Sequence, residues 1–205
     1  MKITGIESVT NNKYKVYLDE QFAFVLYKGE LSRYQVIVGK DLDEDLYHQI
    51  YKESVVKRAK LRAMHLLNAM GRTESQLRQK LAQGLYPEKA IEEAIAYVKS
   101  FGYINDVEYA RSYISSRKEK KSRKELYMLL VGKGIDSEVL DTVFEEEYDN
   151  DDSAIQAIKS IMIKRRYHPD DATDKDTQKM LGYLMRKGFK YEDIRKVIQV
   201  SEWNA

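Results

Sequence analysis

The sequence contains no cysteine and only two prolines, Pro87 and Pro169. Without cysteine the chain can form neither a disulfide framework nor a thiolate metal site, and it has no cysteine nucleophile. No apolar run approaches the roughly 20 residues that a membrane-spanning helix requires. The opening residues, MKITGIESVT, lack the apolar core of a signal peptide. We therefore expect a cytoplasmic protein.

Signatures of catalysis and of cofactor binding are also scarce. The histidines, His48, His65 and His168, are isolated, and none stands in an HExxH spacing. No glycine-rich phosphate loop follows a predicted strand, and no nucleophile is coupled to a general base. We expect no metal, no cofactor and no enzymatic activity.

The first part of the chain is rich in β-branched and aromatic residues. The segments KITGIESV, KYKVYL and QFAFVLY are short and are separated by hairpin-length links, which predicts a three-stranded meander. Alternation along the strands puts Tyr14, Val16 and Leu18 on one face, and Phe22, Phe24 and Leu26 on the matching face of the next strand. GELSRYQV then predicts a helical turn, and DLDEDLYHQIYKE a helix with acids in its first turn.

From about residue 55 onward the pattern is helical, and three segments align in register without a gap. They are QLRQKLAQGLYPEKAIEEAI, ELYMLLVGKGIDSEVLDTVF and KMLGYLMRKGFKYEDIRKVI. The coinciding apolar positions are Leu77, Leu126 and Met180; Leu81, Leu130 and Leu184; Tyr86, Ile135 and Phe189; Ile91, Leu140 and Ile194; and Ile95, Phe144 and Ile198. Gly134 and Gly188 also coincide, whereas the first copy has Leu85 there. This is the signature of a structural repeat.

Each aligned block holds two helices around a turn, and a further amphipathic helix precedes each block. Capping-box spacings predict several of the helix starts, at Thr73 with Gln76, Asn105 with Glu108, Ser122 with Glu125, and Ser153 with Gln156. The predicted fold is mainly α. It consists of three tandem three-helix repeats in an elongated, curved array, preceded by a small domain that contains the β-meander. The predicted boundaries are 1–54, 55–104, 105–149 and 150–205.

Charge is segregated along the chain, although the formal net charge is only +2. From Arg111 to Lys124 there are seven bases and one acid, whereas Asp136–Asp152 holds nine acids and no base. A helix start at Ser122 would add amide donors beside the bases, which suits phosphate oxygens. Lys164–Arg166 ends the first helix of the third repeat and occupies a similar place. The alternative is a solvated loop with cations at a helix C-terminus.

The predicted nucleic-acid or protein contacts are therefore basic. The candidate residues are Arg111, Arg117, Lys118, Lys120, Lys121, Arg123, Lys124, Lys164, Arg165 and Arg166. Tyrosines flank the basic run and could stack on exposed bases. Tyr109 fits a core position better, and Tyr113 and Tyr127 fit either role.

The stretch FGYINDVEYA at residues 101–110 is predicted to be a joint between repeats. Gly102 can take the left-handed conformation that closes the preceding helix, and Asn105 can cap the next one. Tyr103 and Ile104 are then expected to fill the seam between the first two repeats, with Tyr109 facing inward.

These residues resemble the RecX family of bacterial recombination regulators. The resemblance is carried by GYIND at 102–106, by Glu108-Tyr109-Ala110 with Arg111, Tyr113 and Arg117, by TESQLRQKL, and by the three repeats, over residues 55–205. It implies a non-enzymatic modulator that binds in the groove of the RecA–DNA filament and limits ATP hydrolysis and strand exchange, and that also binds DNA. By position, it implies contacts from Arg111, Arg117 and the basic run after them.

The leading hypothesis is a regulator of the RecA filament, acting in recombination and DNA repair as a monomer. One alternative is a stand-alone DNA-binding protein, because the basic run alone would bind phosphates. Another is a scaffold whose acidic helix binds a basic protein, because phosphate would repel Asp136–Asp152.

Overall fold

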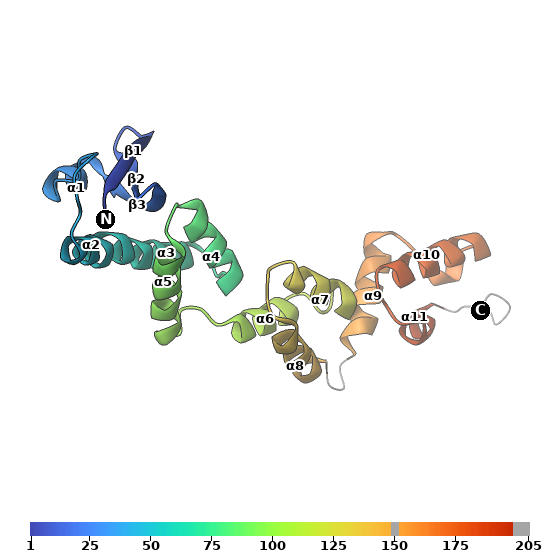
Figure 1. Cartoon of the computed structure of the whole chain (residues 1–205). Helices are drawn as coiled ribbons and strands as arrows, with labels where there is room; N and C mark the ends of the chain where they lie inside the picture. The colour runs from blue at the N-terminus through green and yellow to red at the C-terminus, as the bar shows by residue number, and fades with distance from the viewer. Residues whose placement is uncertain (149–151, 199–205) are drawn as a thin grey trace. The chain divides into compact units, whose positions relative to one another are not determined.

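The structure, a computed structural model, describes residues 1–148 and 152–198. The chain forms two compact units, Met1–Asn105 and Asp106–Ala205 (Figure 1). Part of the acidic run, residues 149–151, and the last residues of the predicted third repeat, 199–205, lie outside the described residues. The mainly helical fold with a small N-terminal sheet is confirmed.

The N-terminal sheet is the predicted three-stranded antiparallel meander, in the order β1-β2-β3. Its strands are β1 (Ile3–Thr10), β2 (Lys13–Leu18) and β3 (Gln21–Tyr27). Val16 lies opposite Phe24, and both are fully buried. The prediction for Phe22 is wrong. The pairing of β2 with β3 shifts register between Val16 and Tyr17, so Phe22 pairs with Tyr17 and is 40% exposed. A bulge of this kind re-aims the side chains beyond it.

The helices after the sheet begin with α1 (Lys28–Arg33), which matches the predicted helical turn. They continue with α2 (Glu44–Ile50), the π-helical η1 (Tyr51–Val56) and α3 (Lys57–Ala69). Asp43 caps α2, because its side chain accepts a hydrogen bond from the Leu46 amide at 2.7 Å. Residues at the α2–η1 and η1–α3 junctions keep helical backbone angles, so 44–69 is one continuous helix. The boundary predicted between residues 54 and 55 falls inside it.

Arg58 on α3 fastens the sheet to the first helices. Its guanidinium donates to Glu30 Oε2 and to the Val25 carbonyl, both at 2.5 Å, and lies 4.8 Å from the Tyr27 ring centroid. One hydrophobic core runs from the sheet into the helices of this unit, from Phe24 to Leu81 for example. The sheet therefore covers an apolar face of the first repeat.

Three groups of three helices follow the predicted repeat (Figure 1). They are α3 with α4 (Glu74–Gln83) and α5 (Glu88–Ser100); α6 (Asp106–Ser115), α7 (Arg123–Val131) and α8 (Ser137–Glu147); and α9 (Ser153–Lys164), α10 (Asp174–Arg186) and α11 (Tyr191–Val197), with the short 3-10 turn η2 (Pro169–Asp171) before α10. The aligned residues Leu81, Leu130 and Leu184 are all fully buried. All the other aligned apolar residues are buried as well, except for Tyr86, which is half-buried.

The turn between the second and third helices has the same backbone in every repeat. Gly134 and Gly188 have φ values of 77° and 90°, and Leu85 has a φ of 63° at the equivalent position. Glycine tolerates this left-handed conformation, whereas a leucine side chain is strained there. The first repeat therefore keeps the turn at the cost of local strain.

Two of the four predicted helix starts, at Thr73 and at Ser122, are confirmed by their caps. Thr73 and Gln76 form the reciprocal capping box of α4, and Ser122 caps α7 by accepting a hydrogen bond from the Glu125 amide at 3.1 Å. The start predicted at Ser153 is wrong by one residue: Asp152 holds the N-cap position and Ser153 is the first residue of α9.

The joint at residues 101–105 closes α5 as predicted. Gly102 has a φ of 69°, and the Tyr103 amide donates to the Val98 carbonyl at 3.0 Å, which ends the helix in a left-handed turn. Ile104 is buried in the core of the first unit. The Tyr103 ring is 56% exposed and stacks on Phe101 with centroids 5.7 Å apart, and its place in the seam between the first two repeats stays a prediction.

Candidate nucleic-acid interface

Repeats two and three meet at the start of α7. Ser122 donates a hydrogen bond from Oγ to the carbonyl oxygen of Lys187, on the turn between α10 and α11. The ammonium of Lys187 lies 3.4 Å from Glu125 Oε2. This pair of contacts brings the basic run of repeat two beside the basic turn of repeat three.

A cavity of about 400 Å³, here called the basic cavity, opens at this junction. Its lining residues are Lys120, Lys121, Glu125, Ile161, Lys164, Arg165, Tyr183 and Lys187. Lys120 and Lys121 come from the basic run, and Lys164 and Arg165 from the equivalent place in repeat three. The structure therefore brings together four of the sequence-predicted residues, from two stretches that are more than 40 positions apart in the chain.

The acid in the basic cavity organises its lysines. Burial alone would raise the pKa of Glu125, but the hydrogen bond and charge of Lys121, with the charge of Lys187, lower it overall. Glu125 is therefore an anion that holds two lysines at the cavity. Arg165 is fixed differently, because its guanidinium lies 3.6 Å from the Tyr183 ring centroid. The surplus positive charge suits phosphate oxygens.

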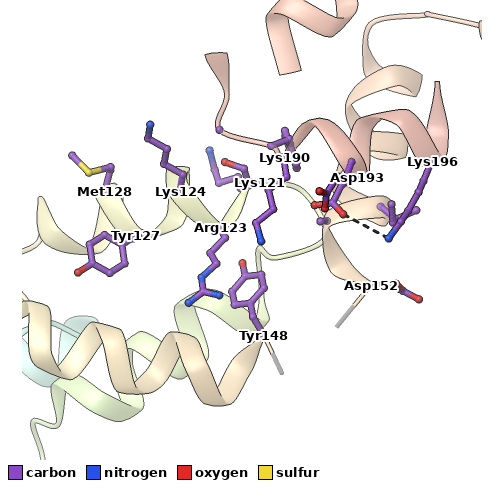
Figure 2. Close-up of a pocket in the computed structure, with 16 residues that line it drawn as sticks. Lys121, Arg123, Lys124, Tyr127, Met128, Tyr148, Asp152, Lys190, Asp193 and Lys196 are labelled. Atoms are coloured by element: carbon purple, nitrogen blue, oxygen red, sulfur yellow. Dashed lines mark ion pairs between the residues drawn. The ribbon is translucent and has the colours of Figure 1, made fainter. Parts of the chain in front are cut away.

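Other predicted residues line two further cavities. Lys121, Arg123 and Lys124 contribute to a cavity of about 710 Å³, here called the inter-repeat cavity, which Figure 2 shows. Arg165 and Arg166 line a smaller one of about 290 Å³. Residues of the basic run thus line both the basic cavity and the inter-repeat cavity.

Arg111, Arg117 and Lys118 do not join the basic cavity. Arg111 donates to Glu146 and to Glu108, each at 2.6 Å, and the hydrogen bonds to Glu146 and then Glu108 raise its pKa. Lys118 donates to the Glu147 carbonyl at 3.3 Å. These pairs tie α6 and the following turn to α8, so they serve the packing of repeat two. The Arg117 guanidinium lies 4.1 Å from the ring centroid of Tyr113, one of the tyrosines that fit either role.

The acidic helix α8 is partly neutralised within its own repeat. Asp136 caps it by accepting from the Glu138 amide at 2.8 Å, and Asp141 accepts from the Tyr127 hydroxyl at 2.9 Å. Its last turn holds the carboxylates that Arg111 and Lys118 approach. The ring of Tyr127 packs on Phe144 with centroids 5.3 Å apart, so this tyrosine is anchored at both ends.

Lys187 and Tyr183 are functional candidates that sequence reasoning missed. They come from the aligned block of repeat three, whereas the basic residues predicted in that repeat, Lys164–Arg166, precede the block. The signal was the sequence MRKGFK, in which Lys187 precedes the turn glycine Gly188. Its proximity to Lys121 depends on the hydrogen bond from Ser122, which no periodicity encodes.

Two kinds of feature are absent from residues 1–148 and 152–198. Within those ranges, no group of three or more histidine, aspartate or glutamate side chains is placed to hold a metal ion. No helix in the described part of the chain has the length and apolar character needed to cross a membrane. The basic cavity is the candidate site on which the charge pattern and the structure agree.

Comparison with known proteins gives the family. The family model for "RecX, first three-helix domain" matches residues 59–97, and that for "RecX, third three-helix domain" matches 152–198. A regulatory protein RecX from Caldanaerobacter subterraneus is 27% identical, over 96% of this chain and 97% of that protein. The regulatory protein RecX of Listeria innocua is 30% identical, over 94% of this chain and 72% of its own.

A solved structure supports the fold. The crystal structure of a regulatory protein RecX is 24% identical, with a TM-score of 0.61, and the match covers 97% of this chain and 98% of that one. The resemblance inferred from GYIND and the repeats is thus confirmed, and this chain belongs to the RecX family of regulatory proteins.

Proposed function

We propose that this chain binds a RecA recombinase filament and DNA, and that it inhibits the filament's ATP hydrolysis and strand exchange without catalysing a reaction itself. The observation that carries the proposal is the basic cavity, where basic residues from two repeats converge. Lys120, Lys121, Lys164 and Arg165 present their charges together, and Lys187 adds a fifth. A phosphate backbone is the polyanion that such a cluster suits.

The proposal narrows the residues that contact DNA. We assign phosphate contacts to Lys120, Lys164 and Arg165, because all three are exposed and the Tyr183 ring positions the Arg165 guanidinium. Arg111 is instead assigned to the packing of α6 against α8, because both of its ion pairs are at 2.6 Å. Lys118 also pairs with the end of α8, at Glu147, and is assigned to the same packing.

The test is RecA ATP hydrolysis on single-stranded DNA with increasing amounts of the chain. We expect inhibition by the native chain and much weaker inhibition by Lys164→Glu/Arg165→Glu. The matched control is Lys52→Glu/Lys57→Glu, which reverses two exposed lysines of the first unit and is expected to inhibit normally. If the native chain leaves the ATPase rate unchanged at one molecule per few RecA subunits, the proposed function is wrong.

Stand-alone DNA binding is the second candidate, and the same cavity favours it. Without RecA, affinity for single-stranded DNA should fall with salt, and the log–log slope should become shallower by about 0.7 per lost phosphate contact. A Lys164→Glu/Arg165→Glu chain that loses DNA binding but still inhibits RecA would show that the two activities use different surfaces. A parallel loss would assign both to the basic cavity.

A further inference from the structure

The inter-repeat cavity is larger than the basic cavity and differs from it in chemistry. It lies where the start of α7, the end of α8, the start of α9 and the turn before α11 meet (Figure 2). Its volume of about 710 Å³ lies within the range of about 300–1,000 Å³ that is typical of small-molecule sites. The proposed function does not use this cavity.

One side of the cavity offers flat, rigid surfaces. Arg123 and Tyr148 lie together on the α8 side, and the Arg123 guanidinium is 5.6 Å from the Tyr148 ring centroid (Figure 2). The Tyr148 ring also stacks on Phe144, parallel to within 4° and with centroids 5.6 Å apart, and the Arg123 guanidinium lies 5.8 Å from the Phe144 centroid. Tyr127 is anchored by Asp141. Guanidinium and aromatic planes of this kind accept a planar heterocycle by stacking.

Another side carries positive charge from both repeats. Lys124 comes from the first turn of α7, and Lys190 immediately precedes α11; both are exposed. Lys196 is engaged by Asp193, 3.9 Å away. Among the residues that the structure describes, five cations and three acids line the cavity. Lys121 is paired with Glu125 and Lys196 with Asp193, so Arg123, Lys124 and Lys190 face two further acids and leave a small positive surplus for an anion of low charge.

The acidic residues in the lining further restrict the chemical class of ligand that the cavity can bind. Asp152 and Glu192 also line the cavity. Carboxylates repel a long polyanion, but they accept hydrogen bonds from hydroxyl groups, as the acidic residue on the ribose does in dinucleotide sites. A stacking plane, a pair of lysines and carboxylates for hydroxyls together match the base, the phosphate and the sugar of one nucleotide.

We propose that the inter-repeat cavity binds a nucleoside 5′-phosphate, with the base beside Arg123 and Tyr148 and the phosphate at Lys124 and Lys190. The same group could be a free nucleotide or the phosphorylated end of a strand. Because α7 and the turn before α11 both contribute, an occupied cavity would also clamp the second repeat to the third.

Calorimetric titration of the whole chain tests the proposal. The probes are adenosine 5′-monophosphate, inorganic phosphate and a short 5′-phosphorylated oligothymidylate. We expect the nucleotide to bind about tenfold or more tightly than phosphate, because only the nucleotide can stack. If phosphate binds as tightly as the nucleotide, or if neither the nucleotide nor the oligonucleotide binds, the proposal fails.

Variants locate the ligand within the cavity. Arg123→Ala should weaken nucleotide binding by about tenfold while leaving phosphate binding intact, and Lys124→Ala/Lys190→Ala should weaken both. Lys52→Ala/Lys57→Ala, at two exposed lysines of the first unit, is the matched control and should change neither. Unchanged nucleotide binding in both Arg123→Ala and Lys124→Ala/Lys190→Ala would place the ligand elsewhere and overturn the proposal. Thermal unfolding of each variant verifies that it is folded.

Competition separates the two sources of the ligand. An oligonucleotide that displaces the nucleotide, and that Arg123→Ala weakens equally, identifies the end of a strand as an occupant. Nucleotide binding without such displacement identifies the free nucleotide. Inhibition of RecA by the Arg123→Ala chain is measured in parallel, so that loss of nucleotide binding can be distinguished from failure of the proposed regulatory function.

Discussion

Replacing Gly188 with alanine probes the contact between the second and third repeats. The backbone at Gly188 has a φ of 90°, and a side chain in such a conformation costs about 1–2 kcal/mol. The added Cβ would lie 2.7 Å from Cβ of Lys124, on α7 of the other repeat. Overpacking of this kind typically costs a further 1–3 kcal/mol or so. We therefore expect Gly188→Ala to destabilise the second unit by about 2–5 kcal/mol.

The steric part can be isolated, because Lys124→Gly removes the atoms that the new methyl group would meet. On that background, Gly188→Ala should cost only the backbone term, about 1–2 kcal/mol. Gly39 supplies a second control. Its φ is 88°, yet an added Cβ would have no neighbour within 4 Å, so Gly39→Ala also reports the backbone term alone.

Urea unfolding of the four chains in this double-mutant cycle gives the coupling energy between positions 124 and 188. We expect about 1–3 kcal/mol. A cost of Gly188→Ala that is the same with Lys124 and with glycine at position 124 would refute the reasoning, because the contact between the repeats would then contribute nothing.

Three further changes are predicted. Leu85→Gly removes the backbone strain of a leucine in the left-handed conformation, but glycine loses about 0.5–1 kcal/mol more conformational entropy on folding. Urea unfolding should therefore show a change in stability within about 1 kcal/mol. A loss of stability well beyond that would contradict the inferred strain at Leu85. Lys121 and Lys187 lower the pKa of Glu125 in the folded chain. The ion pairs of Glu125 therefore contribute fully to folding stability above the ordinary pKa of a glutamate, and that contribution is lost as pH falls through the lowered pKa of the folded state. Glu125→Gln should therefore reduce the fall in unfolding free energy at acidic pH. An unchanged fall would rule out the pairing of Glu125 with Lys121 and Lys187. Arg58→Ala removes two short contacts and should cost the first unit about 2–4 kcal/mol in thermal or urea unfolding, whereas Arg33→Ala, whose carboxylate partner is 3.9 Å away on the surface, should cost less than about 0.5.

Local patterns predicted much of this fold, because repeat periodicity and burial are linked. The alignment that paired Leu126 with Met180 also identified which residues enter the cores, and Thr73 and Ser122 cap the helices that their spacings indicated. The errors lie where one residue changes the register. A bulge after Val16 turned Phe22 outward, and the π-helical segment joins two predicted domains without a break.

The candidate site was predicted only in part. Sequence position grouped Arg111 with Lys121 because both belong to one basic run, but helix geometry turns Arg111 toward α8 and Lys121 toward the third repeat. The converse failure is Lys187, which lies 66 positions from Lys121 in the sequence and yet shares its carboxylate partner. Such a meeting depends on how one repeat packs on the next, and charge patterning along a single helix carries no information about that packing.

The continuous core between the sheet and the first repeat makes residues 1–54 resemble a ligand that is permanently tethered to its receptor. Tethering gives the sheet a high effective concentration at its helical partner, so the apolar surface of α3 stays covered even where individual contacts are weak. A chain trimmed to its three repeats would expose that surface and would also cut through the helix that spans residues 44–69. Such a chain should self-associate, and residues 1–54 supplied in trans should restore its solubility only at concentrations far above that of the chain.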